Sequence, residues 1–301
     1  MSMTSRLLRA CLLAGALGWS LAGGASEILI AASHDSPALQ RFVAALQQRR
    51  PDERVRLLPS HERTTPDALP ADARLILLGA DLLDWRLGHA AGPPTLILQI
   101  SRLQAQQRLG EQRPPQLTLL WSDPPPARQL QLIRRLLPQA RRVGVLYSAH
   151  SVVLADELRR MTAPPGLTLE FQYWPDTGDS QPLNRLLDSS DVLLGLDDPT
   201  LYNPSSIKGI LLASYGRKQA LIGPTAAFIR AGSLSSTYSD QQDWLASLDA
   251  LLDRAPRHWP RAAYPAHFKV LSNPQVARSL GIELDDDERQ AERLRQGEPQ
   301  P

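Results

Sequence analysis

Short apolar segments rich in branched residues alternate with helical patterns along most of the chain. The segment EILIAA (27–32) is followed by a polar loop and a helical pattern at 38–49, and similar apolar segments occur at 55–58, 74–78 and 95–100. Strands that are buried on both faces of a sheet have this short, continuous apolar character, and helices connect such parallel strands. The alternation therefore predicts an α/β fold of parallel sheets with helices on both faces.

A second series of the same kind begins near the middle of the chain. An apolar segment at 117–121 and a helix at about 127–137 precede VGVLY (143–147), where we expect a new sheet to start. The patterns beyond it predict helices and strands at 152–161, 167–173, 181–188, 192–196, 205–217, 220–223, 240–252, 269–271 and 273–281. A chain of this length accommodates two domains of about 100–200 residues each.

The first residues predict export to the bacterial periplasm. Two arginines precede an apolar run, 11–21, that is too short to span a bilayer, and small residues follow it. We therefore expect residues 1–25 to be a signal peptide and the mature chain to begin at Ser26. The single cysteine, Cys11, would leave with the signal, so we expect neither a lipid anchor nor a disulfide in the mature protein.

The charge of the chain excludes some classes of partner. The formal net charge is +2, and two of the positive charges lie in the predicted signal peptide, so the mature protein is close to neutral. Nothing in this balance indicates binding to nucleic acid or to a membrane surface. Residues 285–301 are charged and rich in turn-forming residues, which predicts a flexible, solvated tail.

Familiar catalytic motifs are missing from the sequence. It has no phosphate-binding G-x-x-x-x-G-K loop, no G-x-S-x-G nucleophile turn and no H-E-x-x-H zinc helix. The six histidines are scattered. Asp197 and Asp198 are adjacent, so in an extended backbone their carboxylates point to opposite faces, which suits paired acid/base chemistry poorly. We expect no enzyme activity, no cofactor and no metal.

Four stretches carry a resemblance to a known family. They are QLIRRLLPQARRVGVLY (131–147), DVLLGLDDPTLYN (191–203), LIGPTAAFIRAGSLSSTYSD (221–240) and LSNPQVARSLGIEL (271–284). Together they resemble the substrate-binding proteins of ABC transporters, in the branch described as handling aromatic amino acids or similar small solutes. The resemblance covers about residues 117–284.

The resemblance implies the type I periplasmic binding fold. Two Rossmann-like lobes, each a parallel sheet flanked by helices, would be joined by several hinge crossings. The implied first lobe contains residues 26–140 and 224–263. The implied second lobe contains residues 141–223 and 264–284. A ligand would lie between the lobes, beyond the carboxyl ends of the strands, and closing the lobes would bury it.

Polar residues after the first strand of each predicted sheet are candidate ligand contacts. Ser33, His34 and Asp35 follow the first strand, although Ser33 or Asp35 could instead cap the next helix. The resemblance implies a ligand-facing loop at Tyr147, Ser148 and Ser151, for which the alternative is an ordinary polar turn.

The strongest candidate is Asp198. The resemblance implies that an acidic residue at Asp197 or Asp198 faces the ligand, often reaching a ligand amine. The alternative is that one of the two holds the turn before Pro199. Tyr202 and Asn203 could add a stacking face and an amide.

Three further candidates match the later part of the family pattern, which also shows two departures. They are Thr225, Ser235 and Tyr238; Asp240 could contribute or could only cap a helix. The family often has an acidic residue where Thr225 stands, which puts recognition of an amine in doubt. It also carries a glycine-rich ligand loop where this chain reads LQAQQRLGEQRPPQ (103–116). Either the ligand differs from the family norm, or transport-linked binding has been lost.

The function expected from these patterns is capture of a small organic solute by a monomeric receptor that delivers it to an ABC permease. The alternative is a periplasmic sensor or accessory protein that signals to a membrane partner. A third possibility, a structural envelope protein, would show a cleft filled by its own side chains.

Overall fold

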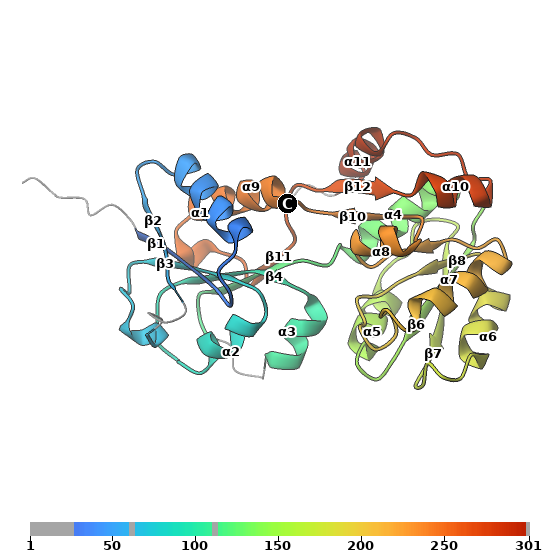
Figure 1. Cartoon of the computed structure of the whole chain (residues 1–301), viewed down its shortest axis with the longest axis horizontal. Coiled ribbons are helices and arrows are strands. Elements are labelled where there is room, and N and C mark those ends of the chain that lie inside the picture. The colour runs from blue at the N-terminus through green and yellow to red at the C-terminus, as the bar shows by residue number, and fades with distance from the viewer. Residues whose placement is uncertain (1–26, 60–63, 110–113, 299–301) are drawn as a thin grey trace, which may run out of the picture.

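The computed structural model describes residues 27–59, 64–109 and 114–298, and these form two lobes side by side (Figure 1). The predicted signal peptide at 1–25 lies outside the described residues. Each lobe is built on one six-stranded sheet with helices on both faces. This arrangement confirms the expected two-lobed α/β fold. No helix among the described residues is long and apolar enough to cross a membrane.

The sheet of the first lobe is entirely parallel, in the order β11-β5-β4-β3-β1-β2. Its strands are β1 Glu27–Ala32, β2 Arg54–Leu57, β3 Arg74–Leu78, β4 Thr95–Ile100, β5 Leu117–Trp121 and β11 Ala262–Ala263. Its helices are α1 Pro37–Arg49, α2 Asp81–Leu87, α3 Arg102–Arg108 and α9 Gln241–Leu252. Neighbouring side chains along β1 enter opposite cores: Ile28 and Ile30 pack with α1 and α9, and Leu29 packs with α2.

The sheet of the second lobe has the order β12-β10-β9-β8-β6-β7 and is parallel except for β12, which runs antiparallel to β10. Its strands are β6 Arg142–Tyr147, β7 Thr168–Tyr173, β8 Val192–Leu194, β9 Leu221–Ile222, β10 Ser235–Tyr238 and β12 Lys269–Ser272. Its helices are α4 Pro126–Leu136, α5 Val152–Arg160, α6 Gln181–Ser189, α7 Ile207–Gly216, α8 Ala227–Ala231, α10 Pro274–Leu280 and α11 Asp287–Gln296.

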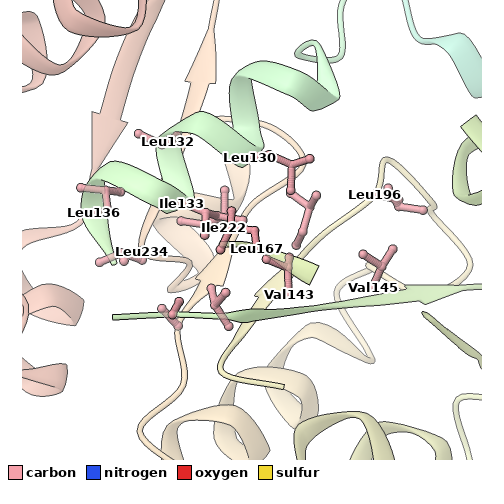
Figure 2. Close-up of a cluster of buried hydrophobic side chains, with 14 of the residues drawn as sticks. Leu130, Leu132, Ile133, Leu136, Val143, Val145, Leu167, Leu196, Ile222 and Leu234 are labelled. Carbon is pink, nitrogen blue, oxygen red and sulfur yellow. The ribbon is translucent and has the colours of Figure 1, made fainter. Parts of the chain in front are cut away.

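Two of the points where the chain passes between the lobes differ from the prediction. The first crossing comes earlier in the sequence than predicted, and the second comes later. Helix α4 was expected in the first lobe, but its apolar side chains, including Leu130 and Ile133, pack with Val143 and Ile222 of the second (Figure 2). Strand β10 was also expected in the first lobe, but it pairs with β9 and β12. The crossings therefore lie between β5 and α4, between β10 and α9, and between β11 and β12.

The prediction of a flexible tail at 285–301 is wrong for most of that segment. Residues 287–296 form helix α11, capped by Asp286, whose carboxylate accepts from the backbone amides of Glu288 and Arg289. The helix lies beside β12 (Figure 1) and buries Ala291 and Leu294 in the core of the second lobe. Most of its other residues are charged, and these two apolar positions were the only sequence evidence that the segment packs against the lobe.

Candidate functional site

The carboxyl ends of the parallel strands are the natural site for a ligand in this architecture. In the first lobe these ends border a pocket of about 510 Å³. Residues at the ends of β1 and β3 and after them, Gln99 near the end of β4, and residues at the starts of α1 and α9 line it: Ser33, His34, Ser36, Gly79, Asp81, Gln99, Ser239, Asp240, Gln241 and Trp244, with Ala32, Ala38, Leu39, Phe42 and Leu78. A hollow of about 900 Å³ lies elsewhere, between α4, α11 and the loop after α10, and includes Ala140, two residues before β6 begins.

Two of the three residues predicted after β1 line this pocket. Ser33 is half-buried and His34 is exposed, and both border the pocket. The alternative role as a helix cap belongs to neither Ser33 nor Asp35, because Ser36 caps α1 by accepting from the amide of Leu39 at 3.1 Å. Asp35 instead accepts from the Gln40 side chain at 2.9 Å on the surface.

Gln99 is a pocket residue that sequence reasoning missed. It lies in β4 where the pairing with β5 shifts register, and its φ of 58° is in the left-handed region that side chains rarely adopt. Such strain persists where the surrounding structure imposes it, and it concentrates at ligand sites. The sequence carried no signal for it, because glutamine has no special preference for this conformation.

In the second lobe, Ser148, Ser151 and Asp198 come together in one buried network. The hydroxyls of Ser148 and Ser151 donate to Asp198 Oδ2 at 2.6 and 2.5 Å, and Thr200 donates to Oδ1 through its hydroxyl at 2.6 Å and its amide at 2.9 Å. Burial raises the pKa of Asp198, but these donors outweigh burial and lower it. Asp198 is 1% exposed, and its oxygens hold the loop after β6 and the turn through Pro199 and Thr200.

Asp197 has a different environment from its neighbour. It lies at the meeting point of the lobes, beside Arg102 of the first lobe, Asp123 of the crossing segment and Pro224 of the second lobe, at a hollow of about 20 Å³. A hollow of that size has room for about one water molecule. Burial raises the pKa of Asp197, and the nearby Asp123 and Asp198 raise it further, although a hydrogen bond from Ser101 and the charge of Arg102 oppose them.

The raised pKa of Asp197 predicts that Asp197→Asn stabilises the protein at neutral pH. A carboxyl whose folded-state pKa is raised holds its proton more tightly when folded, so its contribution to stability is greatest in acid and is lost as the pH rises through that pKa. We expect Asn to raise the free energy of unfolding by roughly 1 kcal/mol at pH 7 and to bring no gain below about pH 4.

Urea unfolding at both pH values measures this effect, with the exposed Asp176→Asn as the control. A loss of stability at pH 7 would show that the ionised carboxylate makes a needed contact.

Tyr147, Tyr202 and Asn203 differ in how far they can reach a ligand. Tyr147 is half-buried at the end of β6, its ring centroid 5.5 Å from that of Tyr173. Tyr202 is 4% exposed and packs edge-on against Phe228, at 6.2 Å, within the core of its lobe. Asn203 binds within its own turn, accepting from the Ser205 amide at 3.0 Å. Tyr147 is therefore the one residue of the three that lies at the end of a strand and is partly accessible to a ligand.

The remaining candidates lie in the second lobe after β9 and in β10, on the way to the crossing into α9. Thr225 is half-buried just after β9. Ser235 is fully buried inside β10 and donates to the Leu271 carbonyl at 3.1 Å. Tyr238 is half-buried at the end of β10, opposite Lys269 of β12. Asp240, which also borders the pocket, caps α9 through the amides of Gln242 and Asp243.

The described residues show no metal centre. No group of three or more His, Asp or Glu side chains within 27–59, 64–109 and 114–298 is arranged to hold a metal ion.

Comparisons with known proteins find likeness in structure alone. No protein-family model matches the chain, and no curated protein matches it. A substrate-binding protein with adhesive properties from Clostridium difficile, CD0873, in its ligand-free open form, is 16% identical with a TM-score of 0.66, over 88% of this chain and 97% of that one.

Two further solved structures are similar. The ABC domain in complex with L-Trp from Streptococcus pneumonia is 18% identical with a TM-score of 0.53, over 87% of this chain and 96% of that one. A conserved domain protein from Vibrio cholerae is 17% identical with a TM-score of 0.53, over the same shares, 87% and 96%. At these identities the likeness establishes the two-lobed, periplasmic-binding-protein-like fold.

Proposed function

We propose that this chain is a periplasmic substrate-binding protein of an ABC-type transporter, which holds a small organic solute between its lobes without covalent chemistry. The observation that carries the proposal is the pocket of about 510 Å³ at the carboxyl edge of the first sheet. Ligand sites are typically concave, about 300–1,000 Å³, and placed at this edge of open α/β sheets. The structurally similar CD0873 protein is a substrate-binding protein, which supports the same interpretation.

The pocket lining indicates the kind of solute. Phe42 and Trp244 provide apolar surface, while Ser33, His34 and Gln99 provide hydroxyl, imidazole and amide groups. This combination suits a small molecule with an apolar or aromatic body and a few hydrogen-bonding groups. An aromatic amino acid is one such molecule.

The second lobe would complete the site when the lobes close. Tyr147 is the last residue of β6 and Thr225 follows β9, both toward the carboxyl edge of the second sheet, and both are partly exposed. Closure of two lobes about hinge segments is the usual way in which such a fold encloses a solute. We propose that the monomeric protein acts in the periplasm, after removal of residues 1–25, and presents the closed form to a permease.

A thermal-shift screen tests this function. The purified chain is unfolded and refolded to remove bound solute, then heated with amino acids, aromatic metabolites, nucleosides or sugars. A solute that binds only the folded state adds about 2.7 kcal/mol of stability at a hundredfold excess over its Kd. A saturable rise in Tm with one class identifies the ligand, whereas no rise with any class overturns solute capture.

Variants in the pocket locate the site. We expect Ser33→Ala and Gln99→Ala to weaken binding of that solute about fivefold each, because each removes a hydrogen bond worth about 1 kcal/mol. Calorimetric titration measures the Kd. The matched control is Gln48→Ala, an exposed position in α1 outside the pocket lining, which should leave the Kd unchanged. Equal affinity in all variants would place the ligand elsewhere.

A second candidate is a sensor or accessory protein that signals to a membrane partner. One observation favours it: side chains of the protein itself fill the space between the lobes around Asp197, leaving about 20 Å³. Such a protein would show no shift in the solute screen while keeping the same fold.

A further inference from the structure

The two lobes touch where α3 of the first meets α5 of the second, at a contact that we call the α3–α5 junction (Figure 1). The junction comprises Ser101, Arg102 and Leu103 on one side, and Leu154, Glu157 and Asp197 on the other. We propose that Arg102 is an electrostatic latch, which holds the two lobes together through Glu157 and must release Glu157 when they separate.

Arg102 is fixed firmly to the first lobe. Its backbone amide donates to Asp123 Oδ1 at 2.8 Å, and its Nε donates to Asp123 Oδ2 at 2.7 Å. Asp123 is 5% exposed, and the ring centroid of Tyr264 lies 6.0 Å from the guanidinium carbon of Arg102. The backbone bond fixes the start of α3, and the bond from Nε to the same buried carboxylate orients the guanidinium so that its terminal nitrogens reach across the junction.

The contact across the junction is an ion pair with a releasable partner. One terminal nitrogen of Arg102 donates to Glu157 of α5. The Arg102 side chain is 14% exposed and the Glu157 side chain is 42% exposed, so Glu157 can return to water at little cost while Arg102 stays in place. The ion pair can therefore break by movement of Glu157 alone, while Arg102 keeps its position on the other side of the junction.

Apolar packing at the junction is limited. Leu103 of α3 is 3% exposed and joins the core of the second lobe beside Leu154. A hollow of about 100 Å³ next to it, bordered by Trp121 and Val153, shows that the two helices do not pack densely. Loosely packed contacts contribute less attraction than a filled core, so the ion pair carries a large share of the hold between the lobes.

Arg102 offsets the negative charge of the carboxylates at the junction. Three carboxylates converge on the junction: Asp123 from the crossing segment directly after β5, and Glu157 and Asp197 from the second lobe. Arg102 interacts with all three. Without the positive charge of Arg102, the carboxylate of Asp123 would face those of Asp197 and Glu157. Like charges in a partly buried setting repel each other. Removing Arg102 therefore turns an attraction between the lobes into a repulsion.

The distance between the lobes in the ligand-free chain tests the latch. Spin labels at the exposed positions Ala90→Cys in the first lobe and Arg185→Cys in α6 of the second report this distance by pulsed electron resonance, in the full chain carrying Cys11→Ser. We expect the ratio of long-distance to short-distance populations to rise about threefold with Glu157→Gln. This is the change in an equilibrium that the loss of one partly exposed ion pair typically causes. With Arg102→Met we expect about tenfold.

Three controls separate the effect of the ion pair from other causes of lobe opening. Arg159→Met, on the same helix as Glu157 but paired with Asp156 of its own lobe, should leave the distances unchanged. Adding Glu157→Gln to Arg102→Met should widen the distances no further, because the pair is already broken. Raising the salt from 0.1 to 1 M should open the natural sequence but not the Arg102→Met chain.

Identical distance distributions in the natural sequence, Glu157→Gln and Arg102→Met would overturn the latch. Circular dichroism confirms that each variant is folded, and the exposed Glu157→Gln gives a result even if Arg102→Met does not fold. The experiment uses no ligand, so its outcome is separate from that of the solute screen.

Discussion

Replacing Asp198 with alanine is expected to lower the free energy of unfolding by about 3 kcal/mol, because hydrogen bonds to a charged group are worth about 1.5–3 kcal/mol each and several are lost together. Ser148, Ser151 and Thr200 all donate to this carboxylate, which is 1% exposed. Their hydroxyls would lose a buried acceptor, and the Thr200 amide would lose its partner as well. Urea unfolding followed by circular dichroism measures the loss.

The pH dependence of stability distinguishes the charge of Asp198 from its shape. A carboxyl with a lowered folded-state pKa contributes stability that is complete above its unfolded pKa, about 3.9, and is lost as the pH falls through the folded value. Asp198→Asn keeps the shape and one acceptor oxygen, and the serine hydroxyls can turn to accept from its amide. We expect a loss of about 1 kcal/mol at pH 7 and a weaker dependence of stability on pH in acid.

The matched control for Asp198 is Asp176→Ala, an exposed aspartate of the same lobe that accepts from the Gly178 amide at 2.8 Å. It should change stability by less than about 0.5 kcal/mol. If Asp198→Ala were equally mild, the buried network would contribute nothing to stability, and a free carboxylate waiting for a ligand amine would become the better account of Asp198.

Replacing Gly195 with alanine is expected to destabilise the protein by about 3 kcal/mol, the upper end for overpacking a filled core. A Cβ at this position would lie 2.8 Å from Pro224 Cδ and 3.4 Å from the Ile222 carbonyl oxygen. The proline ring cannot rotate away, and Gly195 donates its amide to that same Ile222 oxygen at 2.9 Å, so the end of β8 must shift. Calorimetric unfolding measures the change.

Gly209→Ala is the matched control for Gly195. This glycine lies exposed within α7, and a Cβ there would meet nothing within 4 Å. Alanine favours a helix over glycine, so we expect a gain of about 0.5–1 kcal/mol. Similar effects of the two substitutions would mean that β8 and the loop after β9 can separate at little cost.

Part of the candidate site could be predicted from the sequence. A polar residue after a buried strand belongs at the carboxyl edge of a sheet, which placed Ser33, His34 and Tyr147 correctly at strand ends. The orientation of each side chain could not be predicted in this way. Asp197 and Asp198 are the same residue type in adjacent positions, and contacts distant in sequence turn one toward the first lobe and the other into a buried network.

Strand β10 shows why some of the fold could not be predicted. Its residues Ser235, Ser236 and Thr237 are fully buried although each is polar. Their hydroxyls find partners in the Leu271 carbonyl, the Gly223 carbonyl and the Gln129 side chain, all far along the chain. A polar strand can be buried only when such partners are present, and only the assembled lobe supplies them.

The sequence by itself determined the alternation of strands and helices, the parallel sheets and the division into two lobes, because apolar periodicity acts over a few residues and decides which face of each element is buried. The tertiary structure alone decided where the chain crosses between lobes, the docking of helix α11 beside β12 and the meeting of Arg102 with Glu157. These features depend on contacts between residues that are neighbours only after folding, so no local pattern could reveal them.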